Sequence, residues 1–190
     1  MNDLPNGPPR ALLDRVAESA AREGLIDVAY AQVDSPLGPL TVAATGAGLV
    51  SLTYPEHPVD AVLERLAAEV SPRVLEAPER LDGIRRELDE YFRGGLECFA
   101  TPVDWTLTRG FYRRVLEATA RVGYGETTTY AAVAEGAGNV RAVRAAGTGL
   151  GSNPVPVVVP CHRVLRSGGA LGGYTGGLER KEFLLALERG

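Results

Sequence analysis

The segment NPVPVVVPCHRV, residues 153–164, carries the most informative pattern in this chain. Residues 155–159 are apolar at every position, which predicts a buried strand. The run ends in Pro160-Cys161-His162, and the proline ring restricts both its own backbone and that of the residue before it. We therefore expect the Cys161 thiol to be held in place at the end of a buried segment.

Cys161 has two interpretations. A buried, inert cysteine is a common packing residue. A cysteine near a histidine is also the usual arrangement for a reactive thiol, because a general base raises the fraction of thiolate. Neighbouring side chains diverge on strands and helices, so Cys161 and His162 need a bridging water or a sharp turn between them. A third group should orient the imidazole, and Glu188 is a candidate that this reasoning does not single out.

The residues before this segment predict short helices. Helices are expected over 110–122, 130–135 and 140–149, with glycine-containing breaks between them. The last two match a helix-turn-helix, and the second carries Arg141 and Arg144. Helical hairpins are common in proteins of every kind, so this pattern alone leaves DNA binding and simple packing equally open.

A glycine-rich stretch, residues 168–177, follows the segment. It lacks the Gly-Lys-Ser/Thr ending of a phosphate-binding loop, so a nucleotide-cradling role is not expected. We interpret it as backbone that approaches a flat base closely, with a plain flexible loop as the alternative.

The first half of the chain predicts a different architecture. Runs at 28–33, 40–45 and 49–54, separated by turn signals, predict an antiparallel meander, and helices are expected over 59–70 and 81–92. The fold class is therefore α+β: a small N-terminal domain with an antiparallel sheet, then a mostly helical helix-turn-helix domain that carries Cys161. The expected divisions are an N-terminal extension at 1–24 with a short helix over 10–23, an α+β domain at 25–104 and a C-terminal domain at 108–190.

Composition and charge limit the classes of function. The chain of 190 residues has no apolar run long enough for a membrane span and no signal-peptide pattern at its start. With two cysteines we expect reduced thiols and a cytoplasmic protein. The net charge of −4 is uneven: residues 108–190 hold eleven Lys and Arg against six Glu, a net +5, which leaves −9 for the first 107. This split favours a polyanion as the partner of the second half.

The pattern becomes specific when its flanks are included. NPVPVVVPCHRV, preceded by RAVRAAGTGLGS (141–152) and followed by SGGALGGYTGGLERKEFLLALE (167–188), resembles the O6-alkylguanine-DNA alkyltransferases, or methylated-DNA–protein-cysteine methyltransferases. The resemblance covers about residues 108–189. Family members usually begin this domain with Pro-Phe-Gln, where this chain has Gly110-Phe111-Tyr112. Some relatives hold zinc in the N-terminal domain, but Cys98 and His57 are too few ligands, so no metal and no cofactor is expected.

The resemblance implies catalytic roles for five residues. The acceptor of the alkyl group falls on Cys161, its water-bridged histidine on His162, and the glutamate that completes the relay on Glu188. The tyrosine that acts at the flipped nucleotide falls on Tyr130. Asn153 matches the residue that supports the turn and the relay.

The resemblance also implies how DNA and the damaged base are held. The helix-turn-helix enters the minor groove, and Arg144 is the finger that fills the gap in the base stack. The charge distribution adds Arg141 and Arg163 as residues expected to reach the DNA backbone. The Val164 carbonyl is expected to read the guanine amine and the Thr175 amide to donate toward O6, in a substrate pocket that Tyr174 and Pro156 help to line.

The function implied is direct-reversal DNA repair by a suicide methyltransferase. The alkyl group passes stoichiometrically and irreversibly from O6-alkylguanine, and less well from O4-alkylthymine, to Cys161 after nucleotide flipping. A monomer acting on double-stranded DNA is expected.

Three alternatives stay open. A non-catalytic alkyltransferase-like protein would bind the same lesions, but such proteins lack the acceptor that Cys161 provides. A cysteine hydrolase would need an oxyanion hole and would leave the arginine-bearing helix unexplained. A transcriptional regulator switched by alkylation would need a sensor domain that the sequence does not show.

Overall fold

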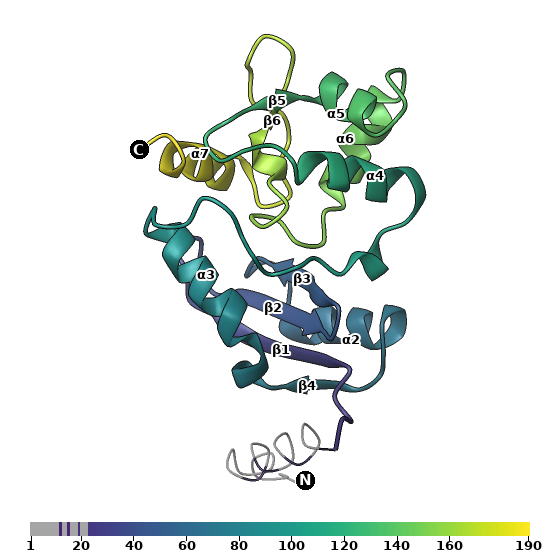
Figure 1. Cartoon of the computed structure of the whole chain (residues 1–190), viewed down its shortest axis with the longest axis vertical. Helices are drawn as coiled ribbons and strands as arrows, with labels where there is room; N and C mark the ends of the chain where they lie inside the picture. The colour runs from purple at the N-terminus through teal and green to yellow at the C-terminus, as the bar shows by residue number, and fades with distance from the viewer. Residues whose placement is uncertain (1–11, 13–14, 16–18, 20–22) are drawn as a thin grey trace, which may run out of the picture.

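The computed structural model describes residues 12, 15, 19 and 23–190. The predicted extension at 1–24 and its helix over 10–23 therefore lie almost wholly outside the described residues. The described chain forms a sheet domain, residues 28–92, and a helical domain, residues 110–187, which lie end to end in Figure 1. The predicted α+β class is confirmed. No helix in this described part of the chain has the length and apolar character needed to cross a membrane.

The elements follow in a simple order. The sheet domain contains β1 (Val28–Val33), β2 (Leu40–Thr45), β3 (Gly48–Thr53), α2 (Val59–Glu69), β4 (Val74–Glu76), a 3₁₀ helix (Pro78–Leu81) and α3 (Asp82–Phe92). A second 3₁₀ helix (Trp105–Leu107) lies between the domains. The helical domain contains α4 (Gly110–Thr119), β5 (Thr128–Thr129), α5 (Tyr130–Gly136), α6 (Val143–Gly151), a 3₁₀ helix (Cys161–Arg163), β6 (Val164–Leu165) and α7 (Leu178–Leu187).

The four strands of the sheet lie in the order β3-β2-β1-β4. β1 pairs antiparallel with β2, where Tyr30 lies opposite Ala43, and β2 pairs antiparallel with β3. The predicted meander is thus confirmed. β4 was not predicted, because its three residues are too few to show an alternating pattern. It pairs parallel with β1, and Val28 lies opposite Val74.

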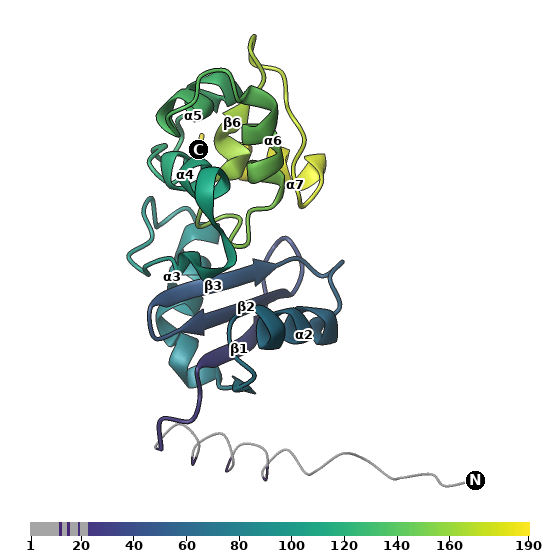
Figure 2. The same cartoon turned by 90° about the vertical axis from the view of Figure 1, so that its right-hand side faces the viewer.

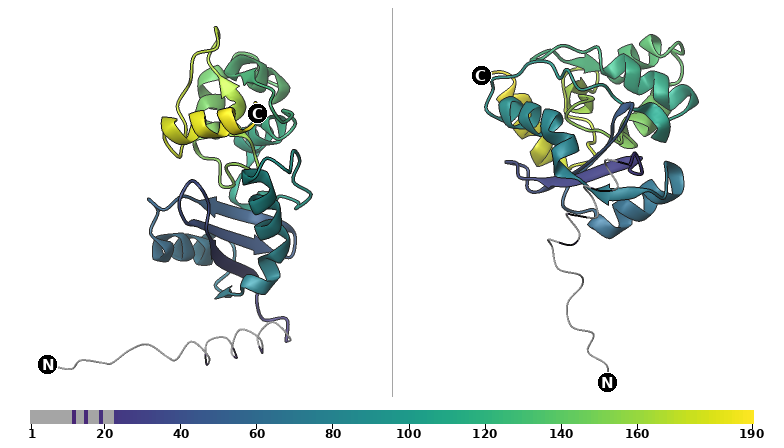
Figure 3. Two further views of the ribbon diagram at one scale, coloured as in Figure 1. Left: turned by 90° about the vertical axis from the view of Figure 1, so that its left-hand side faces the viewer. Right: turned by 60° about the horizontal axis from the view of Figure 1, so that its bottom comes forward.

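Helices α2 and α3 cover opposite faces of the sheet (Figure 3). Successive side chains of a strand point to opposite faces, so one sheet supplies two apolar surfaces. On the first surface, Val62 and Leu66 of α2 pack with strand residues Val28, Ala43 and Val50. The cluster on the α3 side extends into the helical domain, where its buried members include Val115, Leu116, Val159 and Leu184. The two domains therefore share one apolar core on the α3 side.

Helices α5 and α6 form the predicted helix-turn-helix, and α4 packs against both. The Thr129 side chain accepts a hydrogen bond from the Ala132 amide and so caps the first turn of α5. Helix α6 begins at Val143, three residues later than predicted, because Asn139 prolongs the turn by accepting from the Arg141 amide. Arg141 therefore lies in the turn and not on the helix.

The buried strand predicted over residues 155–159 does not form. The segment turns back on itself: the Val159 amide donates to the Val155 carbonyl over 2.9 Å, and Val157 has a φ of 74°. The Asn153 side chain accepts from the Val155 amide (3.1 Å) and donates to the Val159 carbonyl (2.8 Å). Asn153 thus satisfies backbone groups that a neighbouring strand would otherwise pair. An apolar run predicts that a segment is buried, and this part of the prediction is confirmed. It does not show that the segment pairs as a strand.

Strand β3 is the edge of the sheet that faces the helical domain (Figure 2). Its Leu52 amide donates to the Pro154 carbonyl over 2.8 Å. The turn that precedes Cys161 is therefore fastened to the sheet domain by a backbone hydrogen bond.

Candidate active site

Cys161 lines a cavity in the helical domain. It is the first residue of a 3₁₀ helix, directly after Pro160, and is 5% exposed. The cavity has a volume of about 320 Å³. Its lining consists of Tyr130, Gly147, Leu150, Gly151, Cys161, Gly173, Tyr174 and Thr175. A small molecule or a single base that enters this cavity meets the sulfur.

Burial controls the protonation of the thiol. It raises the pKa of Cys161 to about 11, because the thiolate would lose its hydration. Two neighbours favour the thiolate without overcoming burial: Asn153 Nδ2 donates to Sγ at 3.2 Å, and the Lys181 ammonium contributes positive charge. Cys161 is therefore a neutral thiol at pH 7, and another group has to take its proton when it reacts.

The His162 ring is suited to take that proton. It is fully buried, and Nε2 lies 2.8 Å from Glu188 Oε1. A carboxylate only accepts, so Nε2 carries the ring proton and Nδ1 keeps its lone pair. Nδ1 is buried and has no hydrogen-bond partner among the described residues. Burial lowers the pKa of His162 despite the opposing effect of Glu188, so the ring is neutral and ready to act as a base.

Glu188, directly after α7, anchors a buried network. Its carboxylate accepts hydrogen bonds from Tyr91, Gly125, His162 and Arg163. Burial disfavours the charge, but the hydrogen bonds from His162 and Arg163 outweigh it and hold the pKa of Glu188 at about 2. The carboxylate is therefore ionised at neutral pH and fixes the orientation of the imidazole.

Arg163 belongs to this network and not to a DNA-facing surface, which corrects the expectation from sequence. It is 6% exposed, and its Nε and Nη2 each donate to the Glu188 carboxylate at 2.9 Å. Its Nη1 donates to the Val122 carbonyl, and the guanidinium lies 5.8 Å from the centre of the Tyr124 ring. A guanidinium held in this way has no reach to a phosphate. Its charge instead offsets that of Glu188 and lowers the pKa of His162.

Sequence reasoning missed Tyr91 and Lys181. Tyr91, near the end of α3 in the sheet domain, donates its hydroxyl to Glu188 Oε1 over 2.6 Å across the domain boundary. The buried Lys181 ammonium donates to the Val164 carbonyl over 2.6 Å. The available signal was spacing on α7: Lys181 and Glu188 lie three residues before and four residues after the buried Leu184, on the same helix face. A charged residue on a buried, apolar helix face needs a partner. This spacing therefore indicated that Lys181 and Glu188 bind groups inside the protein.

Tyr130, the first residue of α5, forms one side of the cavity. Its hydroxyl donates to the Gly173 carbonyl over 3.4 Å, and burial raises its pKa, so the hydroxyl keeps its proton. A Cβ on Gly172 would lie 2.1 Å from the Tyr130 hydroxyl. The close approach expected of the glycine-rich loop is therefore made, in this structure, to the Tyr130 ring.

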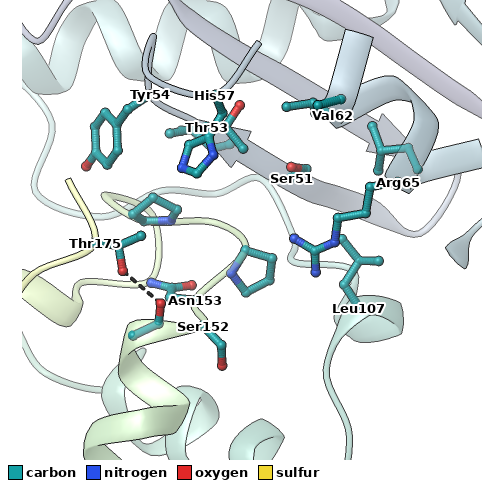
Figure 4. Close-up of a pocket in the computed structure, with 16 residues that line it drawn as sticks. Ser51, Thr53, Tyr54, His57, Val62, Arg65, Leu107, Ser152, Asn153 and Thr175 are labelled. Atoms are coloured by element: carbon teal, nitrogen blue, oxygen red, sulfur yellow. Dashed lines mark hydrogen bonds between the residues drawn. The ribbon is translucent and has the colours of Figure 1, made fainter. Parts of the chain in front are cut away.

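Two of the four predicted pocket residues line this cavity. Tyr174 and Thr175 do, whereas Pro156 lines an adjacent cavity of about 270 Å³ between the domains (Figure 4). The Thr175 hydroxyl donates to the Gly151 carbonyl over 3.0 Å, and both residues line both cavities. This hydrogen bond therefore lies on the boundary between the two spaces. Val164 is buried and lines neither, and its carbonyl already accepts from the lysine ammonium described above.

Arg144 and Arg141 are both exposed. Arg144 lies on α6, three residues before Gly147 and seven before Gly151, so it shares a helix face with two lining residues. Arg141 lies in the turn before the same helix. The helix that forms one side of the cavity therefore carries an exposed positive charge, which suits a polyanion.

Both halves of the chain match models of one protein family. Residues 28–105 match the ribonuclease-like domain of 6-O-methylguanine DNA methyltransferase, and residues 110–190 match its DNA binding domain. The chain belongs to the 6-O-methylguanine DNA methyltransferase family. The resemblance first drawn from residues 108–189 is thereby confirmed and extends to the sheet domain.

Members of this methyltransferase family are similar over most of their length. A methylated-DNA–protein-cysteine methyltransferase of Mycolicibacterium paratuberculosis is 42% identical over 164 residues, which are 85% of this chain and 93% of that protein. One from Methanosarcina acetivorans is 36% identical, covering 84% of this chain and 97% of its own length. The crystal structure of Mycobacterium tuberculosis OGT in complex with DNA has a TM-score of 0.72 at 37% identity, covering 85% of this chain and 92% of that one.

Proposed function

We propose that this family member repairs double-stranded DNA by moving an alkyl group from O6-alkylguanine to Cys161, once per protein molecule. Its relatives are named methylated-DNA–protein-cysteine methyltransferases, and one similar structure is a complex with DNA. The observation that carries the proposal is the setting of Cys161. Its neutral thiol lines a cavity between Tyr130 and Tyr174, next to a buried, neutral His162 backed by Glu188.

The lesion lies inside a duplex, so its nucleotide has to rotate out before sulfur reaches the alkyl carbon. Unstacking costs a few kcal/mol, less for a base that pairs poorly. In the proposal α6 enters the minor groove and Arg144 fills the vacated space, which offsets part of that cost. Tyr130 at the start of α5 steers the nucleotide into the cavity.

The transfer makes one bond and breaks one. The Cys161 thiol gives its proton through a bridging water to His162 Nδ1, and Glu188 stabilises the imidazolium. The sulfur attacks the alkyl carbon in line, the S–C bond forms, and the electrons of the C–O6 bond leave with guanine. Tyr130 protonates the departing base and regains a proton from the relay. The thiol proton is thus, in sum, the proton that guanine gains.

The product is a thioether on a buried residue. Cleaving an S–C bond needs a nucleophile that the cavity lining does not supply, because the lining consists of Tyr, Thr, Leu and Gly besides Cys161. One turnover per molecule follows. The proposal also includes action as a monomer and O4-alkylthymine as a weaker substrate. The non-catalytic alternative loses support because the acceptor is present and has a base beside it.

Mass spectrometry after mixing the protein with a duplex containing O6-methylguanine tests the proposal. We expect one equivalent of protein to gain one methyl group, located on the Cys161 peptide. Cys161→Ala should show no adduct yet still bind the damaged duplex, because other groups hold the base. Cys98→Ala is the matched control, since this second cysteine is exposed and does not line the cavity of Cys161, and it should label fully. An adduct on Cys98, or repeated turnover on an ester or peptide, would sink the assignment.

A further inference from the structure

The two domains are joined at the cavity by four side chains, Tyr54, Glu56, Tyr174 and Arg180, which we call the interdomain clasp. Tyr54 directly follows β3 in the sheet domain, and Tyr174 lies in the glycine-rich loop of the helical domain. Their hydroxyl oxygens are 2.6 Å apart, and their rings meet edge to face with centroids 6.2 Å apart. This hydrogen bond links positions 120 residues apart in the sequence.

Arg180 closes the clasp from α7. Its two terminal nitrogens donate to the Glu56 carboxylate at 2.6 and 3.0 Å, a bidentate pair of the geometrically specific kind. The same guanidinium donates to the Gly176 carbonyl (2.9 Å) and the Leu37 carbonyl (3.3 Å), and it lies 4.7 Å from the centre of the Tyr54 ring. One cation thereby fastens the loop, the β1–β2 connection and Tyr54 together.

The loop backbone lies directly on Tyr54. A Cβ on Gly176 would be 2.5 Å from the Tyr54 ring, so only glycine fits there. Tyr54 itself is 2% exposed and is not among the residues that line the cavity of Cys161. Tyr174 is one of them, and its ring also meets the His162 ring edge to face at 6.4 Å. An effect of Tyr54 on the reaction is therefore transmitted through Tyr174 and the loop that carries it.

We propose that Tyr54 is a positioning residue for alkyl transfer: the clasp holds Tyr174 and its loop at the depth that shapes the cavity for the base. The inference rests on the proposed function and adds that the sheet domain sets how tightly a lesion base fits, although Tyr54 contributes no atom to the cavity. The Tyr54–Tyr174 hydrogen bond is the contact that carries this effect, and the Arg180–Glu56 pair keeps Tyr54 against the loop.

The test uses the full-length protein and free O6-benzylguanine, which needs no extrusion from DNA. Single-turnover labelling is measured against benzylguanine concentration, giving a maximum rate and a half-saturating concentration. Tyr54→Phe removes only the hydroxyl, and we expect the half-saturating concentration to rise about three- to tenfold, as for loss of one hydrogen bond. Tyr174→Phe should act similarly, and the double variant should lose no more than either single variant. Affinity for undamaged DNA should not change.

Tyr112→Phe is the matched control, because Tyr112 is 40% exposed on α4 and lines neither cavity. Arg180→Ala should raise the half-saturating concentration part of the way to the Tyr54→Phe value. Arg85→Ala, which breaks an exposed ion pair with Asp82, should leave that concentration unchanged. Additive losses in the double variant, or unchanged kinetics in Tyr54→Phe, would overturn the inference. So would a loss confined to the fraction of protein that labels, because that is the mark of a purely structural role. Absence of any Cys161 labelling in the unmodified protein would instead refute the proposed function.

Discussion

Cys161 lies between two regions that differ in their charged side chains, which are buried and paired in one region and exposed in the other. On one side the side chains of His162, Arg163 and Glu188 are 0%, 7% and 1% exposed, and the first two both bond to the Glu188 carboxylate. On the other side Tyr130 borders the cavity, and Arg144 is exposed on α6. The buried region fixes its charges by pairing them, which is the condition for keeping ions out of water. The exposed region leaves its charge available to a partner.

This difference shows that a count of the basic residues in the sequence overstates the positive charge that is available to a polyanion. Residues 108–190 carry a net +5, yet Arg163 and Lys181 are buried and Arg180 is held in the clasp. Arg144 is exposed on α6, which also carries residues that line the cavity, and Arg141 is exposed in the turn before that helix. The sign of the charge asymmetry still favours a polyanion, but a smaller share of that charge is free to meet one.

The largest effect is expected from Glu188→Gln, which breaks the buried region. It leaves Arg163 without its carboxylate, and an uncompensated buried charge costs about 3–5 kcal/mol of the free energy of unfolding. Urea denaturation at several pH values measures this. The folded pKa of Glu188, about 2, lies below its ordinary 4.5, so the stabilisation is complete above pH 4.5 and is lost as pH falls toward 2. The difference in unfolding free energy between the unmodified protein and Glu188→Gln should therefore become smaller as the pH falls from 4.5 toward 2.

Arg144→Ala is the control for this difference in stability, since its side chain is exposed. It should change the unfolding free energy by no more than about 0.5 kcal/mol. If Glu188→Gln is equally harmless at pH 7, the buried region does not behave as a coupled network.

The next effect concerns the protonation of Cys161. With a pKa of about 11, the thiolate fraction is small at pH 7 and rises about tenfold per pH unit. In a Cys98→Ala background, the rate of modification by iodoacetamide should therefore rise about a hundredfold from pH 7 to pH 9. A rate that is flat over this range would place the thiolate in the resting protein and assign Cys161 to a charged environment.

Local patterns predicted the elements well and the contacts between distant elements poorly. Alternation and helical periodicity are local, so β1, β2, β3 and α5 could be found from sequence. The pairing of Glu188 with Tyr91 joins residues 97 positions apart, and no local pattern reports it. Arg163 was misassigned for the same reason: its charge is visible in the sequence, whereas the carboxylate that neutralises it is visible only in the fold.

The resemblance located the candidate site more fully than physical patterning did. Cys161 and His162 stood out from the local pattern of an apolar run that ends in Pro160, but Glu188 was one acidic residue among several until its place in the family pattern was considered. The strand predicted over 155–159 failed because burial there depends on Asn153, whose side chain satisfies the backbone of a turn. A polar residue that acts on backbone groups six positions away gives no periodic signal.

On the exposed side, Arg144→Ala should weaken repair of O6-methylguanine in duplex DNA about tenfold or more, because in the proposed mechanism the arginine offsets part of an unstacking cost of a few kcal/mol. Reaction with free O6-benzylguanine should stay within about twofold, since a free base needs no extrusion. The two substrates are compared in the same single-turnover assay. Equal losses on both would move Arg144 into the cavity or into folding.

The smallest effect expected is the dependence of DNA affinity on salt, and it bears most directly on the charge count. Each phosphate neutralised releases counterions and contributes about −0.9 to the slope of log affinity against log salt. If only Arg141 and Arg144 reach the backbone, the slope for a short undamaged duplex should be about −2, so doubling the salt weakens binding about fourfold.

Arg141→Ala should reduce the slope by about one, while Arg65→Ala in the acidic sheet domain should leave it unchanged. A slope of −5 or steeper would mean that further arginines of residues 108–190, such as the exposed Arg166, also meet DNA, and the assignment of the backbone contacts to Arg141 and Arg144 would fail. If the affinity for DNA does not change with salt, electrostatic attraction does not contribute to DNA binding. Insertion and groove contacts would then have to supply the affinity.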